Sequence, residues 1–309
     1  MKVTFLGTGA GLPSKQRNVS SVALHLLKDE GAIWLFDCGE ATQHQILHTT
    51  LKPRKIEKIF ITHLHGDHIY GLPGLLSSRS FQEGSSPLTI FGPKGLDQFI
   101  ETSLNVSQTK LQYPIQFVEI FDGYQLVEAD YTVDVIKLDH GIDSFGYRLT
   151  EHDQIGELQV DRLKALGIQP GPIYQQIKQN EVTELADGRE IARADVVGPD
   201  KKGRKLAIFG DTRFPYRFEK FVKGVDLLIH EATFDGADQN LANQYYHSSN
   251  VEVAQLAKNA NVNQLVLTHL SARYQDQNLR EFLQEAQAIF AKTTVAKDFL
   301  TIEIPKATR

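Results

Sequence analysis

The sequence predicts a mixed α/β (α+β) protein in which two β-sheets pack face to face with helices outside, an αββα sandwich. Short apolar runs rich in β-branched residues recur along the chain and are bounded mostly by Gly, Pro or Asp, which is typical of strands. Helical patterns fall between some of these runs. The strand-like runs form adjacent groups early in the chain and alternate with helical patterns later, which indicates two sheets with helices outside them.

The patterns place each expected element on a residue range. The expected strands are Lys2–Leu6, Ser21–Leu27, Ala32–Phe36, Ile56–Thr62, Tyr131–Leu138, Ser144–Leu149, Lys205–Phe209, Val225–Ile229, Gln264–Thr268 and Phe299–Ile304. The expected helices are Ala41–Leu47, Leu72–Ser80, Gly95–Leu104, Asn250–Lys258 and Leu279–Phe290.

The stretch 151–203 has a different character from the rest. It contains the Gly- and Pro-rich run Gly167–Pro172 and mixed charges, and it shows little periodic pattern that would pack into a core. We therefore predict one domain over residues 1–309, with 151–203 as an insertion that projects from it.

The bulk composition restricts the class of protein. The chain has 309 residues, 41% of them hydrophobic and 23% charged, which are the proportions of a soluble globular protein. Its one cysteine, Cys38, excludes an intramolecular disulfide and fits a reducing cytosol. We see neither the apolar core of a signal peptide nor a run long enough to cross a bilayer, so we expect a cytoplasmic protein with no membrane partner.

The charge balance limits how the protein could bind nucleic acid. The formal net charge is −5 and the pI is near 6.1, which excludes a surface that is basic throughout. Any RNA binding must therefore come from a local basic patch.

A cluster of metal-binding residue types follows the expected strand Ile56–Thr62. His63, His65, Asp67 and His68 fall within six residues. Imidazole nitrogens and carboxylate oxygens are preferred ligands of zinc, and one zinc would leave one of the four surplus. The alternative is a polar loop that happens to be rich in histidine, which is improbable in a chain with 11 His.

Three further apolar runs also end at potential ligands. Val133–Leu138 leads through Asp139 to His140, Leu206–Phe209 leads to Asp211, and Leu265–Leu267 leads to His269. If these strands share sheet edges, their ends converge on one cleft, which is where α/β architectures place their sites.

The His-x-His-x-Asp-His signature, with His140, Asp211 and His269, resembles the metallo-β-lactamase superfamily. The resemblance implies two Zn²⁺ per subunit, with other divalent ions as alternatives. It implies that His63, His65 and His140 bind one ion, that Asp67, His68 and His269 bind the other, and that Asp211 bridges both. True lactamases tend to have a cysteine among the ligands of the second ion, whereas this chain has Asp211 and keeps Asp67. The resemblance therefore suits phosphoester and thioester hydrolases and disfavours a β-lactamase.

Four further segments resemble the ribonuclease Z family, whose members mature the 3′ ends of tRNA. They are the loop Phe5–Asn18, the run His230-Glu231-Ala232-Thr233, the run His247-Ser248-Ser249 where the family usually has His-Ser-Thr, and the stretch around Gly167–Tyr174, which is similar to the family's flexible arm. The glycines of the first segment alone would indicate only a turn from strand to loop.

The resemblance also implies residue roles. Asp67 is expected to be the general base, and His247 the proton donor to the leaving oxygen, held by Glu231. Taken alone, a histidine before a helix is more often a cap or a surface residue, so only its surroundings favour His247. Residues suggested for substrate binding are Lys15, Arg17, Asn18, Ser248, Ser249, Arg162, Lys164, Gly171, Pro172 and Lys178.

The resulting hypothesis is a zinc-dependent endoribonuclease that removes the 3′ trailer of precursor tRNA. Metal hydroxide would attack the phosphodiester after the discriminator nucleotide and leave a tRNA 3′-OH and a trailer 5′-phosphate. The resemblance further implies a homodimer. Two alternatives stay open: a small-molecule dizinc phosphodiesterase or thioesterase of the same superfamily, and an inactive relative that only binds RNA. No role is predicted for His25, His44, His48, His152 or His230.

Overall fold

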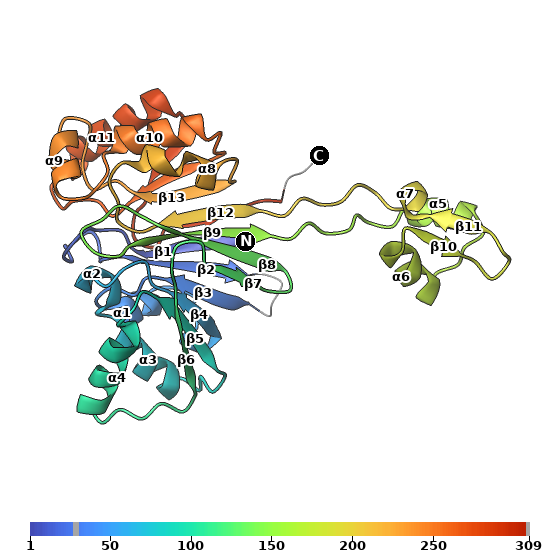
Figure 1. The fold of residues 1–309 in the computed structure, drawn as a ribbon, viewed down its shortest axis with the longest axis horizontal. Coiled ribbons are helices and arrows are strands. Elements are labelled where there is room, and N and C mark those ends of the chain that lie inside the picture. The colour runs from blue at the N-terminus through green and yellow to red at the C-terminus, as the bar shows by residue number, and fades with distance from the viewer. Residues whose placement is uncertain (27–30, 307–309) are drawn as a thin grey trace. The chain divides into compact units, whose positions relative to one another are not determined.

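The computed structural model describes residues 1–26 and 31–306 (Figure 1). The chain forms two compact units. The first contains residues 1–150 and 205–305, and the second contains residues 151–204 together with Lys306 of the described C-terminal residues.

The first sheet of the first unit has the strand order β16-β1-β2-β3-β4-β5-β6. β16, β1, β2 and β3 pair antiparallel, and β3 to β6 run parallel. Its strands are β1 (Lys2–Gly7), β2 (Ser21–Leu26), β3 (Ala32–Phe36), β4 (Ile56–Phe60), β5 (Leu88–Gly92), β6 (Ile115–Glu119) and β16 (Thr301–Glu303). Its helices are α1 (Thr42–Leu47), the short 3₁₀ helix Pro53–Lys55, α2 (Gly66–Ile69), α3 (Leu72–Phe81) and α4 (Leu96–Val106).

The second sheet has the order β15-β14-β13-β12-β9-β8-β7. β12 to β15 run parallel, whereas β9 pairs antiparallel with β12 and β7 antiparallel with β8. Its strands are β7 (Gln125–Val127), β8 (Tyr131–Lys137), β9 (Phe145–Glu151), β12 (Lys205–Phe209), β13 (Leu227–Glu231), β14 (Leu265–Thr268) and β15 (Thr293–Val295). Its helices are the 3₁₀ helix Pro215–Phe218, α8 (Glu219–Val222), α9 (Gln239–Gln244), α10 (Asn250–Asn259) and α11 (Asp276–Ile289).

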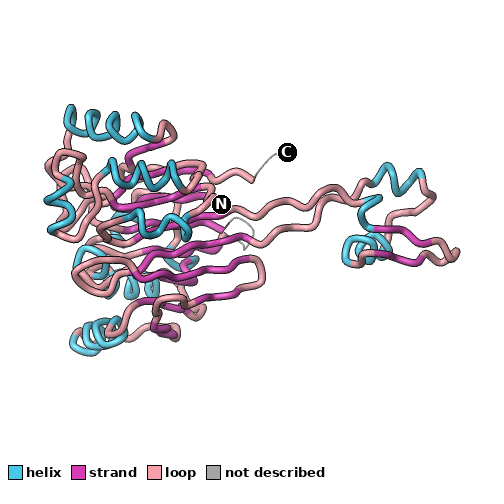
Figure 2. The backbone as a smooth tube through the Cα atoms, turned by 45° about the horizontal axis from the view of Figure 1, so that its top comes forward, coloured by secondary structure: helices cyan, strands magenta, loops and turns pink. Residues whose placement is uncertain are grey.

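Three hydrophobic clusters define the layers of the first unit. The central cluster joins residues of both sheets, such as Phe5, Phe60 and Ile229, and two outer clusters pack each sheet against its own helices. Within the central cluster the rings of Phe36 and Phe91 both stack on Phe60, with centroids 5.0 and 4.8 Å from it. Figure 2 shows the two layers of strands lying between the helices. The predicted αββα sandwich is confirmed.

Every predicted strand and helix range overlaps an observed element, although Leu27 lies outside the described residues. The prediction missed the strands β5, β6, β7 and β15 in the first unit. β6 has the polar residues Gln116 and Glu119 and none of its side chains is fully buried, so it lacks the apolar run that marks a central strand. None of the helices in the described residues has the length and hydrophobicity needed to cross a membrane.

The second unit has a core of its own. It contains α5 (Val160–Ala165), α6 (Pro172–Gln179), the antiparallel hairpin of β10 (Val182–Glu184) and β11 (Glu190–Ala192), and α7 (Arg193–Val196). The buried side chains that pack together are Leu163, Ile168, Ile177, Leu185, Ile191 and Val196. The stretch 151–203, which shows little periodic pattern in its sequence, thus forms a core all the same. Its apolar residues are spread over short elements that each contribute only one or two of them, which hides any period.

The ends of the second unit are also joined. The backbone N–H of Glu151 donates to the carbonyl of Arg204 at 2.8 Å, and the buried guanidinium of Arg204 donates Nε to Glu151 Oε2 at 2.6 Å. Paired charge-assisted hydrogen bonds of this kind are the strong ones.

We predict that Leu163→Ala destabilises the second unit by about 2–5 kcal/mol, because the substitution leaves a cavity at a fully buried position. Hydrogen–deuterium exchange of the amides between residues 160 and 196 measures the effect. Leu166→Ala is the matched control, since the Leu166 side chain is 38% exposed and should cost little. Equal exchange in the two variants would show that the cluster around Leu163 does not hold this unit together.

Candidate metal centre

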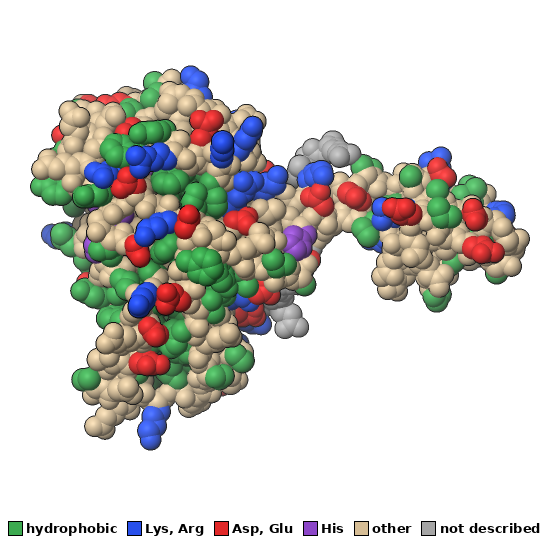
Figure 3. All heavy atoms as spheres, viewed as in Figure 1, with side chains coloured by type: hydrophobic (Ala, Val, Ile, Leu, Met, Phe, Trp, Pro, Cys, Tyr) green, Lys and Arg blue, Asp and Glu red, His purple; other side chains and the backbone are tan. Residues whose placement is uncertain are grey.

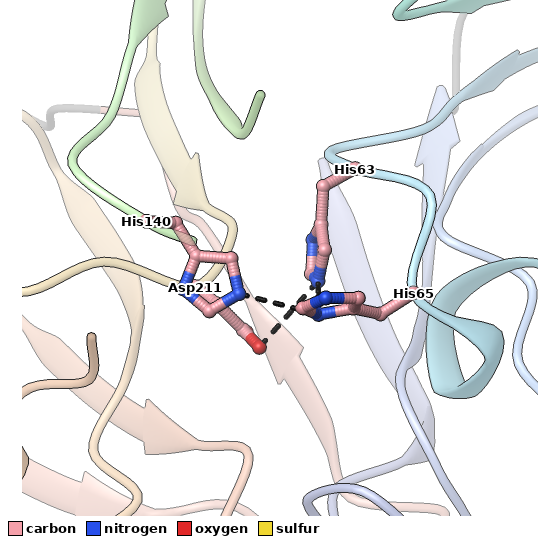
Figure 4. A group of neighbouring side chains, drawn as sticks. All are labelled: His63, His65, His140 and Asp211. Atoms are coloured by element: carbon pink, nitrogen blue, oxygen red, sulfur yellow. Dashed lines mark hydrogen bonds and ion pairs between the residues drawn. The ribbon is translucent and has the colours of Figure 1, made fainter. Parts of the chain in front are cut away.

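Side chains from both sheets meet at one edge of the first unit. His63 lies three residues after β4, Asp211 two residues after β12, and His269 directly after β14. His140 follows β8 and comes from the same sheet as Asp211. Figure 4 shows His63, His65, His140 and Asp211 pointing toward one another. The strand ends thus converge on one cleft as the sequence pattern predicts.

The first group of potential ligands is His63, His65, His140 and Asp211, whose ligand atoms all lie within 4.8 Å of one another. His63 Nε2 and His140 Nε2 lie 3.1 and 3.2 Å from His65 Nδ1. His63 Nε2 is 3.6 Å from Asp211 Oδ2. Three ring nitrogens and a carboxylate oxygen therefore surround one point.

The second group is Asp67, His68 and His269. Asp67 Oδ2 lies 3.2 Å from His269 Nε2 and 3.6 Å from His68 Nε2. Asp211 also faces this group, since its Oδ2 is 3.4 Å from His269 Nε2 and its Oδ1 is 3.6 Å from His68 Nε2. Asp211 is thus the side chain that both groups share.

The chemistry of the potential ligands fits a cation, and the surroundings of Asp211 show this most directly. Its Oδ1 is buried and has no hydrogen-bond partner among the described residues. A buried carboxylate oxygen without a donor is costly unless a cation neutralises it. Burial, and next the charge of His68, holds the pKa of His63 well below its ordinary value, and burial lowers the pKa of His65. Both rings are therefore neutral at pH 7, the form that binds metal.

The negative charge around His68 is strong. Burial lowers the pKa of His68, but the carboxylates of Asp211, Asp37 and Asp67 outweigh it and raise this pKa to about 10. A bound cation would neutralise the same carboxylates.

The second nitrogen of four of these rings is also held. In each case Nδ1 has a partner at 2.7 to 3.0 Å. These partners are Asp37 Oδ2 for His68, Thr62 Oγ1 for His63, the Tyr246 carbonyl for His140 and Thr233 Oγ1 for His269. Such contacts fix the tautomer and the direction of a ligating histidine. The sequence analysis missed Asp37, although it stands directly after the expected strand Ala32–Phe36, as the predicted ligands stand after theirs.

Glu231 and His247 lie beside the cluster. His247 Nδ1 is 3.2 Å from Glu231 Oε1. Burial lowers the pKa of His247, but the charge of Glu231 and the hydrogen bond to it outweigh burial, and the pKa is raised to about 9. Glu231 also accepts the backbone N–H groups of Thr212, Thr233 and Ser248, so its carboxylate is fixed. His247 and Glu231 are thus in direct contact beside the groups of potential ligands.

The N-terminal loop reaches the cluster through one backbone group. The N–H of Gly11 donates to Asp67 Oδ2 at 2.8 Å. The loop itself is held by Asp298, which accepts the Thr8 hydroxyl and the Asn18 backbone N–H, each at 2.7 Å. Arg17 Nη1 donates to Thr8 Oγ1 and to the carbonyl of Ala296. Residues 296–298 thus fix the loop that contacts Asp67.

This geometry corrects part of the predicted substrate-binding set. Arg17 is buried and its guanidinium is used inside the protein, so it holds the loop in place where a phosphate contact was expected. Ser248 and Ser249 are fully buried. Ser248 Oγ donates to the Thr212 carbonyl, and Ser249 forms the N-terminal capping box of α10 with Glu252. Their polar groups serve the fold, which residue identity alone did not reveal.

The other predicted contacts remain accessible to varying degrees. Lys15 is exposed, whereas the side-chain amide of Asn18 donates to the Glu40 carbonyl. In the second unit Arg162 and Lys164 are exposed on α5, Lys178 is half-buried on α6, and Gly171 and Pro172 begin α6. Acidic and basic side chains are mixed on the face of this unit seen in Figure 3.

Four histidines without a predicted role lie outside the groups of potential ligands. His25 Nε2 lies 3.1 Å from Thr4 Oγ1 on neighbouring strands, and the rings of His44 and His48 contact each other on α1 and its C-terminal end. His230 is fully buried, and burial lowers its pKa.

Known proteins share this architecture. The metallo-β-lactamase fold protein YhfI from Bacillus subtilis superposes with a TM-score of 0.68 at 19% identity, covering 97% of this chain and 98% of that chain. The two-sheet body with a His/Asp cluster at its edge is thus a metallo-β-lactamase fold with a candidate metal site. The family described as "Anti-Pycsar protein Apyc1" matches residues 1–152.

More similar relatives define the family. Ribonuclease Z from Oceanobacillus iheyensis is 58% identical over 98% of this chain and 100% of its own length. Ribonuclease Z from Geobacillus kaustophilus is 53% identical over 99% of this chain and 100% of its own length. The crystal structure of human tRNase Z, short form (ELAC1), has a TM-score of 0.71 at 34% identity and covers 99% of this chain and 100% of that chain. The chain belongs to the ribonuclease Z family, which confirms the resemblance inferred from the motifs.

We predict that Asp37→Ala weakens zinc binding about 10- to 100-fold, because His68 loses the acceptor that orients its ring. Competition with a chromogenic chelator measures the zinc affinity directly, without reference to activity. Asp37→Asn, which keeps one acceptor oxygen, should lose less. Wild-type zinc affinity in Asp37→Ala would contradict a role for Asp37 in positioning His68.

Proposed function

We propose that the protein is an endoribonuclease that removes the 3′ trailer of precursor tRNA. It cuts the phosphodiester after the discriminator nucleotide and leaves a tRNA 3′-OH and a trailer 5′-phosphate. The observation that carries the proposal is the assembly of the complete His/Asp cluster in a chain that matches proteins named Ribonuclease Z over its full length. The likeness to human tRNase Z, short form, supports the same substrate.

The cluster is proposed to hold two divalent ions, zinc being the first candidate. His63, His65 and His140 would bind one ion, Asp67, His68 and His269 the other, and Asp211 would face both. When bound, such ions supply a water of lowered pKa and neutralise charge on the phosphate. The neutral rings of His63 and His65 support this assignment, as does Asp211 Oδ1, which accepts no hydrogen bond from the described residues.

Asp67 and His247 are proposed to carry the proton transfers. The hydrogen bond with His269 and the charge of His68 outweigh burial and hold the pKa of Asp67 below its ordinary value, so the carboxylate is ionised at neutral pH. It is proposed to accept the proton of the attacking water. His247 uses Nδ1 to contact Glu231, which leaves Nε2 to protonate the departing 3′ oxygen. Glu231 keeps His247 in that tautomer.

The second unit is proposed to be the inserted tRNA-binding arm predicted for residues 151–203. Exposed Arg162 and Lys164 on α5, and Lys178 on α6, offer charges for phosphate contacts. We also propose that the protein works as a homodimer in the cytoplasm, on the strength of the family resemblance.

A small-molecule dizinc phosphodiesterase or thioesterase is the competing proposal, since it would use the same ligands. A second unit with its own core and exposed basic residues has no evident use for a small substrate, which favours RNA. An inactive RNA-binding protein is disfavoured because all seven potential ligands and the His247–Glu231 pair are present and assembled.

We predict that the purified, zinc-loaded protein cuts a 3′-extended tRNA precursor once, after the discriminator nucleotide, and that a chelator abolishes the cut. End sequencing of both products measures the position and the terminal chemistry. His65→Ala should lose metal and activity together. His247→Ala should keep its metal and slow the cut about 100- to 10,000-fold, the usual contribution of general acid catalysis.

Two outcomes of this experiment would contradict the proposal. One is hydrolysis of a small chromogenic phosphodiester without any cut in the precursor, which would favour the small-molecule hydrolase. The other is binding of the precursor with two metals present and no hydrolysis of either substrate, which would favour an inactive relative.

We predict that Arg162→Glu combined with Lys164→Glu lowers tRNA cleavage far more than it lowers hydrolysis of a small phosphodiester. The slope of the logarithm of the tRNA binding constant against the logarithm of salt concentration should fall in magnitude by about 1 for each phosphate that the variant no longer neutralises. Lys258→Glu combined with Arg280→Glu is the control, because these exposed residues on α10 and α11 give the same change in net charge. If both pairs weaken tRNA binding equally, α5 makes no specific contact with tRNA.

A further inference from the structure

We propose that Phe234, Leu241, Tyr245 and Arg273, here called the aromatic wall, form a stacking subsite for the nucleobase of the discriminator nucleotide, and that this subsite accepts any of the four bases. The inference rests on the proposed function, because it takes His247 as the proton donor to the 3′ oxygen of that nucleotide.

The aromatic wall belongs to the same cleft as the metal cluster. The cleft has a volume of about 450 Å³, and its lining includes His65, Asp67, Asp211, His247 and His269 as well as the four residues of the aromatic wall. Sites for small organic groups are usually about 300–1,000 Å³ and are lined largely by apolar and aromatic side chains. The cleft therefore has room for a nucleotide beside the cluster.

The wall begins at the proposed proton donor. The ring centroid of His247 lies 5.5 Å from that of His269 and 6.2 Å from that of Phe234. The guanidinium of Arg273 lies over the Phe234 ring in turn, 5.2 Å from its centroid. A continuous row thus leads from the metal ligand His269 through His247 to Phe234 and Arg273.

Phe234 is a fixed surface. Its backbone N–H donates to the Ser248 carbonyl, and its own carbonyl accepts the N–H of Asn250 at 2.9 Å. Phe234 is only 6% exposed and the Arg273 guanidinium lies over its ring, so Phe234 supports the wall while Arg273 and Tyr245 offer the accessible faces. Because its backbone is tied to the start of α10, the ring holds its place next to His247.

Arg273 lacks the free charge expected of a phosphate clamp. Its Nη1 donates to Asp238 Oδ2 at 2.6 Å, and this carboxylate compensates the guanidinium charge. What remains available is its planar face, which stacks on bases and aromatic rings. The wall therefore suits a base better than a phosphate.

Tyr245 is the accessible member of the wall. It lies at the C-terminal end of α9, two residues before His247, and is 59% exposed although it lines the cleft. Within the described residues, the Tyr245 ring makes no contact with another aromatic ring, unlike buried rings such as Trp34 and Phe60. Because it lines the cleft, the exposed Tyr245 ring offers a flat surface on which a base can stack.

The proposed chemistry assigns the base that stacks there. If His247 Nε2 protonates the leaving 3′ oxygen, the ribose that carries this oxygen lies next to His247. The base on that ribose is the discriminator base, and the aromatic wall is the apolar surface that lines the cleft beside His247. Trailer nucleotides lie beyond the phosphorus, on the other side of the broken bond.

Base tolerance follows from the residue types in the wall. No Asn, Gln, Asp or Glu of the described residues lines the cleft apart from the carboxylates of the metal cluster. Asn and Gln read adenine, Asp and Glu read cytosine, and Arg reads guanine, through hydrogen bonds to base edges. Arg273 of the lining directs Nη1 to Asp238. Stacking uses the π-face that every base has, so it discriminates weakly among bases.

The test compares Tyr245→Ala, Tyr245→Phe and Tyr216→Ala in single-turnover cleavage of precursor tRNA. Tyr216 is the matched control because it is 60% exposed and does not line the cleft. Tyr245→Ala should lower kcat/KM about 5- to 150-fold, the effect of losing one base stack, and Tyr245→Phe should restore most of the loss. Tyr216→Ala should cleave like the wild type, and zinc content confirms that each variant is folded and loaded.

Modified substrates then identify the base. A precursor with an abasic discriminator position should slow the wild type to the level of Tyr245→Ala, and the two changes together should cost no more than either alone. Precursors with A, C, G or U at that position should differ by less than about 10-fold in the wild type.

Each contrary result has one meaning. Unchanged cleavage by Tyr245→Ala, additive effects of Tyr245→Ala and the abasic discriminator, or loss of the Tyr245 effect only with an abasic first trailer nucleotide would each overturn the subsite while leaving the proposed function intact. A wild type that cuts no precursor would overturn both.

Discussion

The structure depends on negative charge buried where the two sheets meet. Asp37, Asp211 and Glu231 are at most 6% exposed, and an ionised carboxylate in such a place costs several kcal/mol unless it is compensated. Glu231 is compensated by backbone N–H groups and His247, and Asp37 by Thr62 and His68. Asp211 keeps one oxygen without a donor among the described residues. A cation bound at that oxygen would be shared with the imidazoles that both sheets place around it.

Much of this arrangement could be predicted from sequence because ligand chemistry is tied to strand ends. A buried parallel strand appears in the sequence as an apolar run. The end of that run locates the sheet edge at which the following side chains lie. This reasoning identified His63, Asp211 and His269 as potential ligands. It applied equally to Asp37, which was missed because a single carboxylate after a strand is common and carries no motif of its own.

What sequence could not supply is the exposure of individual polar groups. Arg17, Ser248 and Ser249 belong to motifs associated with substrate, yet their side chains are buried and bonded inside the protein. Conversely, Phe234 and Tyr245 look like ordinary apolar residues in the sequence, and only the fold brings them to the cleft. The core of the second unit was hidden for a related reason, since elements of three to eight residues are too short to show a period.

The contact between residues 296–298 and the N-terminal loop gives the site an order of completion. Every potential ligand lies between His63 and His269, so a ribosome has made all of them before it adds Asp298. Until then the Asp298 carboxylate that ties Thr8 and Asn18 in place is missing, and the N–H of Gly11 is not held against Asp67. The cleft is therefore finished only when this late segment has folded back onto the N-terminal loop and β16 has joined β1.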